Sequence, residues 1–245
     1  MPINVGLHPP SSFPTLPLHK NSTHTVNEQL TVLSPISWET YQNLLKDFGD
    51  KSSPHFTYYQ GVLEIMSSRP THEDYNRTLA YLVGILAEEK GIEWRDLGST
   101  TFRREDLASG FEPDGCFYFQ SEALIRNHQE IDLRVDPAPD LVIEIDITSG
   151  SINKLALYGQ VGVAEIWRYD GDTIYFHLLQ NDGSYFTSPT SVVFPCLSAQ
   201  HLTEVMKESK SSGRLALGKA FRSWVREIVS EAMIFYASLS DVLIK

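Results

Sequence analysis

One eight-residue segment constrains the fold more than any other part of the sequence, because its side chains alternate in character. In residues 140–147, DLVIEIDI, a period of two divides the side chains between the two faces of a strand. One face carries Leu141, Ile143, Ile145 and Ile147, and the other carries Asp140, Val142, Glu144 and Asp146. The segment therefore predicts a strand with an apolar core face and an acidic opposite face.

The acidic face has two explanations. A half-exposed strand whose outer face is simply solvated would show the same pattern. However, carboxylates two residues apart on one strand face lie only about 7 Å from each other, and their repulsion destabilises the strand unless a cation compensates it. Mg²⁺ prefers carboxylate and water oxygens, so Glu144 and Asp146 also fit a divalent-metal site. The segment alone leaves both explanations open.

The order of the predicted elements indicates the fold class. We expect an α/β (α+β) domain with a mixed β-sheet flanked by helices, an added β-meander and C-terminal helices, and not a doubly wound nucleotide fold. The elements are a helix from Ser37 to Gly49, a hairpin over 55–66 turning at Gln60-Gly61, a long helix capped by Thr71 and ended by Gly91, strands over 92–97, 99–103, 115–119 and 140–147, a helix over 152–160, a meander over 163–194, and helix from Ser198 onward.

The length supports one main core within 245 residues. Residues 1–33 are rich in proline and polar side chains and have no apolar period, so we expect a disordered or loosely attached leader. We expect the main domain to span 34–205 and a C-terminal helical segment to span 206–245. The first residues lack a secretory pattern and no apolar stretch is long enough to cross a membrane, so we expect a cytoplasmic protein.

Composition excludes several classes of protein. The net charge of −11 argues against binding nucleic acid by bulk charge, although an acidic metal site remains compatible with it. Two cysteines exclude a disulfide scaffold, a four-cysteine zinc site and an iron–sulfur cluster. The sequence also lacks the glycine-rich dinucleotide and phosphate-binding motifs, the zinc-protease motif and the serine-hydrolase motif.

Three further segments carry candidate functional residues. Glu112-Pro113-Asp114-Gly115 reads as a turn, or as an aspartate presented at the start of a strand. Lys154 lies in the first turn of a helix, where the helix dipole disfavours a cation, although a lysine there is usually just solvated. His72 lies in the first turn of the long helix, and capping does not explain it. None of these segments identifies a function by itself.

Together these residues resemble a known family. The sequence is similar to the PD-(D/E)XK nuclease superfamily, and within it to the restriction-endonuclease-like family that is greatly expanded in cyanobacteria. The resemblance covers residues from about 34 to 227. It rests on Gly61-Val62-Leu63-Glu64-Ile65-Met66-Ser67 with His72, on Glu112-Pro113-Asp114, on Pro139-Asp140-Leu141-Val142-Ile143-Glu144-Ile145, on Lys154-x-x-x-Tyr158-x-x-x-Gly162-Val163-x-Glu165-x-Trp167, and on Ala220-Phe221-Arg222-x-Trp224-Val225.

The resemblance implies a restriction-endonuclease-like core and an Mg²⁺-dependent endonuclease, with Mn²⁺ as a possible substitute, that hydrolyses DNA phosphodiester bonds. It implies catalytic roles for Asp114, Glu144, Lys154 and His72, with Asp114, Glu144 and Asp146 as metal ligands and the Ile145 carbonyl as a further one. In the superfamily a lysine follows two residues after the acidic one. That position is Asp146 here, so the positive group is expected from Lys154.

This departure keeps other interpretations open. The first is a DNA endonuclease, which we expect to act as a homodimer that cuts both strands. The second is a catalytically inactive protein of the same fold that serves as a nucleic-acid-binding or interaction module. The third is a nuclease that acts on RNA or branched DNA. Only the first and third need Asp114, Glu144 and Lys154 together, and all three are present.

A basic segment near the C-terminus offers a surface for nucleic acid. Lys219, Arg222 and Arg226 share one face of a predicted helix, opposite an apolar stripe made of Leu217, Phe221, Trp224, Val225 and Ile228. A solvated helix face is the ordinary explanation, and contact with phosphates is the alternative. The apolar stripe could pack within the chain or form a dimer interface.

Overall fold

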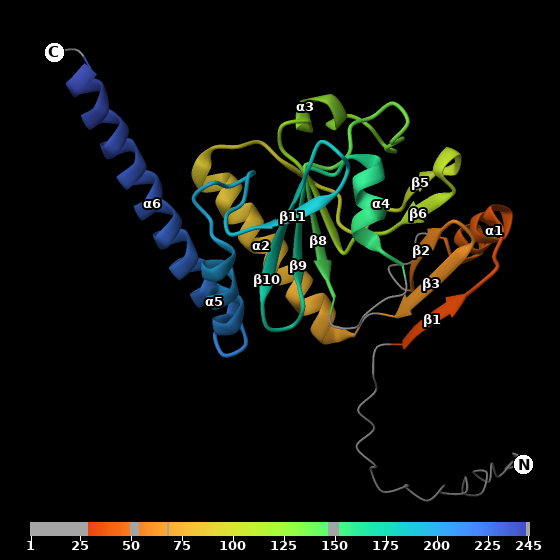
Figure 1. The fold of residues 1–245 in the computed structure, drawn as a ribbon. Helices are drawn as coiled ribbons and strands as arrows, with labels where there is room; N and C mark the ends of the chain where they lie inside the picture. Colours follow the sequence, from red (N-terminus) through yellow and green to blue (C-terminus); the bar gives the residue numbers. More distant parts are fainter. Residues whose placement is uncertain (1–28, 50–53, 68, 147–151, 244–245) are drawn as a thin grey trace, which may run out of the picture.

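The chain folds into two β-sheets with helices on their faces (Figure 1). The computed structural model describes residues 29–49, 54–67, 69–146 and 152–243. The predicted class, a mixed α/β fold, is confirmed, but the strands divide between two sheets where the sequence pattern suggested one. The helices are α1 (Trp38–Phe48), α2 (Pro70–Lys90), α3 (Glu122–Ile125), α4 (Lys154–Val161), α5 (Ala199–Ser209) and α6 (Arg214–Leu243).

The larger sheet carries the acidic strand in its middle. Its six strands lie in the order β11-β10-β9-β8-β7-β4, and only the pair β8 and β9 is parallel. They are β4 (Arg95–Asp96), β7 (Gly115–Tyr118), β8 (Leu141–Ile145), β9 (Glu165–Tyr169), β10 (Ile174–Leu179) and β11 (Tyr185–Ser188). The last three strands form the predicted meander.

The smaller sheet contains the predicted hairpin. Its five strands lie in the order β1-β3-β2-β6-β5, and every pair is antiparallel. They are β1 (Gln29–Leu33), β2 (His55–Tyr59), β3 (Val62–Ser67), β5 (Phe102–Arg104) and β6 (Ser109–Phe111), with a 3₁₀ turn at Glu105–Leu107. Helix α1 covers one face of this sheet, where Tyr41 packs on Tyr58.

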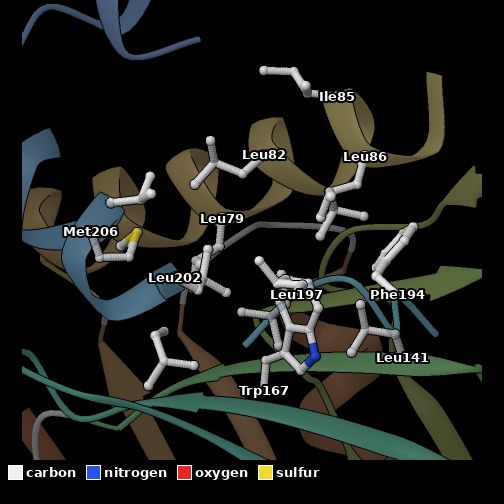
Figure 2. Packing of buried hydrophobic residues seen from close by; sticks show 14 of the residues in the cluster. Leu79, Leu82, Ile85, Leu86, Leu141, Trp167, Phe194, Leu197, Leu202 and Met206 are labelled. Carbon is white, nitrogen blue, oxygen red and sulfur yellow. The ribbon is translucent and has the colours of Figure 1, made fainter. Parts of the chain in front are cut away.

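The main core lies between α2 and the larger sheet. Leucines of α2 contact Leu141 and Trp167 of the sheet, and α5 adds Leu202 and Met206 (Figure 2). A second core on the opposite face of the sheet is built from Val142, α4 and strands of the smaller sheet. Strand β8 is therefore buried on both faces, because it lies in mid-sheet between two layers. The alternation over 140–145 is confirmed, but the face expected to be acidic is buried.

Two boundaries differ from the sequence prediction. Residues 29–33, the end of the expected leader, form β1, which pairs with β3. This edge strand leaves Val32 44% and Leu33 39% exposed, so it lacks the alternation that marks a half-buried strand. Residues 1–28 of the expected leader and Ile147 lie outside the described residues. Helix α2 begins at Pro70 and not after Thr71, because proline suits the first helical position.

The C-terminal helices share the main core. The expected boundary between residues 205 and 206 falls inside α5, and Leu217, Phe221 and Val225 of α6 are buried with the residues of α2. The apolar stripe therefore packs within the chain over this part and is not left open for a second copy. Among the described residues, no helix is long and apolar enough to span a membrane.

Candidate active site

Strand pairing brings Asp114 to the end of β8. Asp114 immediately precedes β7, which runs antiparallel to β8 with Gly115 opposite Ile143. This register places Asp114 beside Ile145, and Oδ2 of the carboxylate accepts a hydrogen bond from the Ile145 N–H at 2.7 Å. Two explanations of the Glu112–Gly115 segment were open from the sequence. The structure shows the second, an aspartate presented at the start of a strand.

Glu144 lies on the opposite face of β8 from Ile145 and points toward α4. Its carboxylate contacts Lys154 and Tyr158. These two residues lie four positions apart in α4 and therefore on the same face of the helix. Lys154 Nζ lies 2.6 Å from Oε2, and the Tyr158 hydroxyl donates to Oε1. The structure thus brings Glu144 and Lys154 together, as the resemblance implies. Tyr158, which completes this cluster, was only part of a motif string in the sequence.

The charged groups of this cluster shift one another's pKa values. Burial and the nearby Glu144 carboxylate raise the pKa of Asp114 to about 7, although His72 and Lys154 oppose this shift. Burial lowers the pKa of Lys154, but the carboxylates of Glu144 and Asp114 outweigh it and raise the pKa above its ordinary value. Lys154 is therefore an ammonium ion at neutral pH, whereas Asp114 is only partly ionised there, because its surroundings only partly compensate a negative charge.

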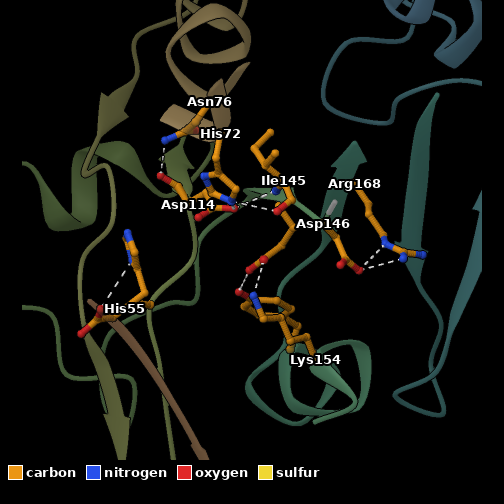
Figure 3. A network of polar contacts seen from close by, with 11 residues as sticks. His55, His72, Asn76, Asp114, Ile145, Asp146, Lys154 and Arg168 are labelled. Atoms are coloured by element: carbon orange, nitrogen blue, oxygen red, sulfur yellow. Dashed lines mark hydrogen bonds and ion pairs between the residues drawn. The ribbon is translucent and has the colours of Figure 1, made fainter. Parts of the chain in front are cut away.

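His72 lies behind Asp114, in the first turn of α2. Its Nε2 is 2.9 Å from the Ile145 carbonyl oxygen and 3.4 Å from Oδ2 of Asp114 (Figure 3). One turn later, Asn76 donates to the backbone carbonyl of Asp114 at 2.7 Å. His72 is fully buried and is not among the residues that line the cavity described below. The geometry therefore fits a residue that holds Asp114 and Ile145 in place.

Asp146 faces a cation of the neighbouring strand. Arg168 of β9 lies opposite Glu144 in the parallel register, and its Nε and Nη2 lie 2.9 and 2.7 Å from Oδ2 of Asp146. Among the described residues, no group of three or more His, Cys, Asp or Glu side chains is arranged to hold a metal ion. The three-ligand set of Asp114, Glu144 and Asp146 thus stays a prediction, and Asp146 is the member that has a competing partner.

A cavity of ≈ 250 Å³ lies between the two sheets and α4, and Glu144, Asp146 and Lys154 line it, whereas Asp114 and His72 are not among its lining residues. Two of its polar residues, His55 and Arg168, were not singled out from the sequence. Glu64 of β3 accepts a hydrogen bond from the Ile152 N–H at 2.7 Å, which joins the smaller sheet to the segment before α4. The lining residues include His55, Glu64, Glu112, Glu144, Asp146, Lys154, Tyr158 and Arg168. The residues missed, His55 and Arg168, stand in strands whose local patterns carry no chemical signal.

The donor set fits a small divalent cation. The carboxylates of Asp114 and Glu144 and the carbonyl of Ile145 are hard oxygen donors, and Mg²⁺ is commonly bound by one or two carboxylates together with water and phosphate oxygens. Lys154 is one cation beside two buried carboxylates, and burial together with the Glu144 carboxylate raises the pKa of Asp114, so a bound cation would stabilise the ionised form of Asp114. The residues present are therefore compatible with the metal that the resemblance implies.

Two arginines on the basic face of α6 form ion pairs with glutamates of α2. Arg222 contacts Glu88 and Glu89 of α2 at 2.7 and 2.5 Å, and Arg226 contacts Glu89 at 2.6 Å. These arginines attach α6 to α2. A solvated helix face and contact with phosphates were the two explanations open from the sequence, and the structure shows a third arrangement, in which Arg222 and Arg226 form ion pairs with α2.

Comparisons with known proteins show the family of this chain. Residues 38–206 match the model of the Uma2 family, which is described as "Putative restriction endonuclease". A solved structure from Anabaena variabilis ATCC 29413, titled as "a putative nuclease belonging to DUF820", is 16% identical. The match covers 70% of this chain and 99% of that one, with a TM-score of 0.48. No curated protein matches the sequence. The family model covers more than half of the chain and includes every residue of the site, so the chain belongs to the Uma2 family of restriction-endonuclease-like proteins.

Proposed function

We propose that this chain is a metal-dependent endonuclease that hydrolyses phosphodiester bonds of DNA, with Mg²⁺ or Mn²⁺ as its cofactor. The observation that carries the proposal is that the buried Asp114 is held against Ile145, next to the Glu144–Lys154 pair that lines the cavity, although the three residues come from segments far apart in the sequence. A purely structural ion pair would explain Glu144 and Lys154, but it would not explain a second buried carboxylate with a raised pKa beside them.

Asp114 and Glu144 would hold the metal, and the Ile145 carbonyl is the next available oxygen. When bound, the ion would lower the pKa of a water molecule and offset the negative charge of the phosphate. Asp146 is left out of this ligand set because its carboxylate is paired with Arg168. Cleavage of both strands by a homodimer remains a prediction.

The chain's own residues have separate tasks in this site. Lys154 keeps its proton, so its ammonium group can orient water or a phosphate oxygen but cannot accept a proton. Tyr158 and Lys154 fix the two oxygens of Glu144. His72 and Asn76 hold the backbone around Asp114 and Ile145. The low exposure of Asp114 and Glu144, 3% and 4%, limits the access of bulk water.

A plasmid-nicking assay with Mg²⁺ or Mn²⁺ tests the proposal. The wild type should cleave, and Asp114→Ala, Glu144→Ala and Lys154→Ala should each lose at least about 100-fold in rate, because each removes part of one constellation. The matched control is Asp74→Ala, since Asp74 is a surface carboxylate paired with Arg214 away from the cavity. Cleavage that survives all three site changes contradicts the site. Inactive wild type that still binds DNA supports the non-catalytic alternative.

A further inference from the structure

His55 is a buried histidine at the cavity that neither the sequence motifs nor the proposed site uses. It begins strand β2 of the smaller sheet, is 5% exposed, and lines the cavity together with Glu144, Lys154 and Tyr158. Among the described residues, neither ring nitrogen of His55 has a hydrogen-bond partner. A buried imidazole without partners is costly, so its position calls for an explanation beyond packing.

One carboxylate stands beside the ring. Oε2 of Glu112 lies 3.6 Å from Nδ1 of His55, on the side of the ring that Figure 3 marks with a dashed line. Glu112 is itself held in place, because Oε1 accepts from the Thr101 hydroxyl at 2.7 Å and Oε2 accepts from the Phe56 N–H at 3.3 Å. A carboxylate near Nδ1 favours the tautomer in which Nδ1 carries the hydrogen, which leaves the lone pair of Nε2 as an acceptor.

The other polar groups of the cavity are poor proton acceptors. Lys154 is protonated, and Glu144 is bound by Lys154 and Tyr158. Asp146 is paired with Arg168, and Glu64 accepts the backbone N–H of Ile152. His55 is the remaining titratable side chain of the cavity whose acceptor atom has no partner in the described structure.

We propose that His55 is the general base of this site and that Glu112 positions its ring. The inference rests on the proposed hydrolysis of a phosphodiester. As the water oxygen forms its bond to phosphorus, Nε2 of His55 takes the water proton. The bond from phosphorus to the leaving oxygen breaks, that oxygen takes a proton from solvent, and His55 then returns its own proton to solvent. His55 is a catalytic residue in this scheme and Glu112 is a positioning residue.

The surroundings keep the imidazole neutral. Burial lowers the pKa of His55. The charged groups that act on it are Glu73 and His72 of α2, Glu144 of β8 and Lys154 of α4, of which the two glutamates raise the pKa and the other two lower it. Glu112 is the carboxylate in contact with the ring. A neutral imidazole is the form that a general base needs.

Kinetics on the full chain with Mg²⁺ test the assignment. His55→Gln should lower kcat by about 100-fold or more, with KM changed by less than about twofold, because a general base acts on the chemical step. At saturating Mg²⁺ the wild type should lose kcat in acid with an apparent pKa below that of an ordinary histidine, because the pKa of His55 is lowered, and His55→Gln should lose this acid limb. His177→Gln is the matched control, because His177 is also a buried histidine with a lowered pKa but lies in β10, outside the cavity.

A second measurement does not depend on cleavage. In ¹⁵N-histidine NMR of the wild type, His55 should be neutral at pH 7 with its hydrogen on Nδ1, and Glu112→Gln should change the tautomer population. A hydrogen on Nε2 overturns the proposal, and so does a kcat of His55→Gln within about threefold of wild type. Inactive wild type overturns the proposed function and the role of His55 together, whereas active wild type with an unaffected His55→Gln overturns the role of His55 alone.

Discussion

Lys154 Nζ lies 2.6 Å from Oε2 of Glu144, and this ion pair joins the first turn of α4 to the buried strand β8. Glu144 is 4% exposed, so its charge has little water to stabilise it and depends on Lys154 and the Tyr158 hydroxyl. The ion pair between Lys154 and Glu144, which we propose to serve phosphodiester hydrolysis, therefore also stabilises the fold around it.

Breaking this pair from one side should destabilise the protein. Lys154→Met leaves Glu144 buried without its cation and should cost about 2 kcal/mol in urea unfolding, less than a fully buried pair because the lysine side chain is 30% exposed. The double variant Glu144→Gln with Lys154→Met should regain most of that stability and remain inactive. Lys207→Met is the control, since Lys207 pairs with the exposed Asp172 at 3.3 Å. A double variant as unstable as the single one contradicts this account.

Asp114 should make the metal-free protein less stable as the pH rises. Its pKa is raised from 3.8 to about 7, so between these values the folded state holds a proton that the unfolded state has released. Stability from this group is thus complete below about pH 4 and is lost as the pH rises to about 7.

Replacing Asp114 by asparagine should remove the loss of folding stability that its ionisation causes at high pH. With EDTA at pH 8, Asp114→Asn should raise the Tm by at least about 2 °C, because the buried charge is gone, and the gain should vanish near pH 4. Thermal unfolding followed by circular dichroism measures both. Asp74→Asn, at a 70% exposed side chain, should show neither effect. A lower Tm for Asp114→Asn at pH 8 contradicts the raised pKa.

Local sequence patterns predicted those features that depend on local periodicity. The alternation over 140–145 placed Glu144 and Ile145 on opposite faces of a strand, and the glycines after α1, α2 and α4 ended the predicted helices. The turn at Gln60-Gly61 fixed the hairpin that carries His55. Each of these features follows from contacts between residues that are close in the sequence.

The division of strands between two sheets has no such local signal. The cavity forms where β2 and β3 of the smaller sheet approach α4 and β8, and sequence periodicity does not encode that approach. The sequence therefore contains no sign that His55 and Arg168 would face a common cavity. His55 is an isolated histidine at the start of β2, and Arg168 is an ordinary polar residue within β9. Their partners, Glu112 and Asp146, come from distant segments.

Glu165 should prove structural although it belongs to the motif that relates this chain to its family. The residue is fully buried, and its carboxylate accepts the N–H groups of Val192 and Val193 at 2.8 and 2.9 Å and the indole N–H of Trp167 at 2.6 Å. Glu165→Ala leaves three buried donors without an acceptor and should cost at least about 3 kcal/mol. Cleavage per folded molecule should not change, and Glu204→Ala on the exposed face of α5 should alter neither property. A selective loss of activity would place Glu165 in the site.

The arginines of α6 should affect stability and not the binding of DNA. Arg222 and Arg226 are engaged with Glu88 and Glu89, and the Glu89 side chain is only 12% exposed. Arg222→Ala with Arg226→Ala should lower the Tm by a few degrees, because α6 loses its polar attachment to α2 while its apolar contacts remain. The salt dependence of DNA binding, followed by fluorescence anisotropy, should keep its slope, since ion pairs made within the protein release no counterions from DNA. Adding Lys219→Ala separates the exposed lysine from the paired arginines. A flatter slope in the double variant would make this helix part of the binding surface.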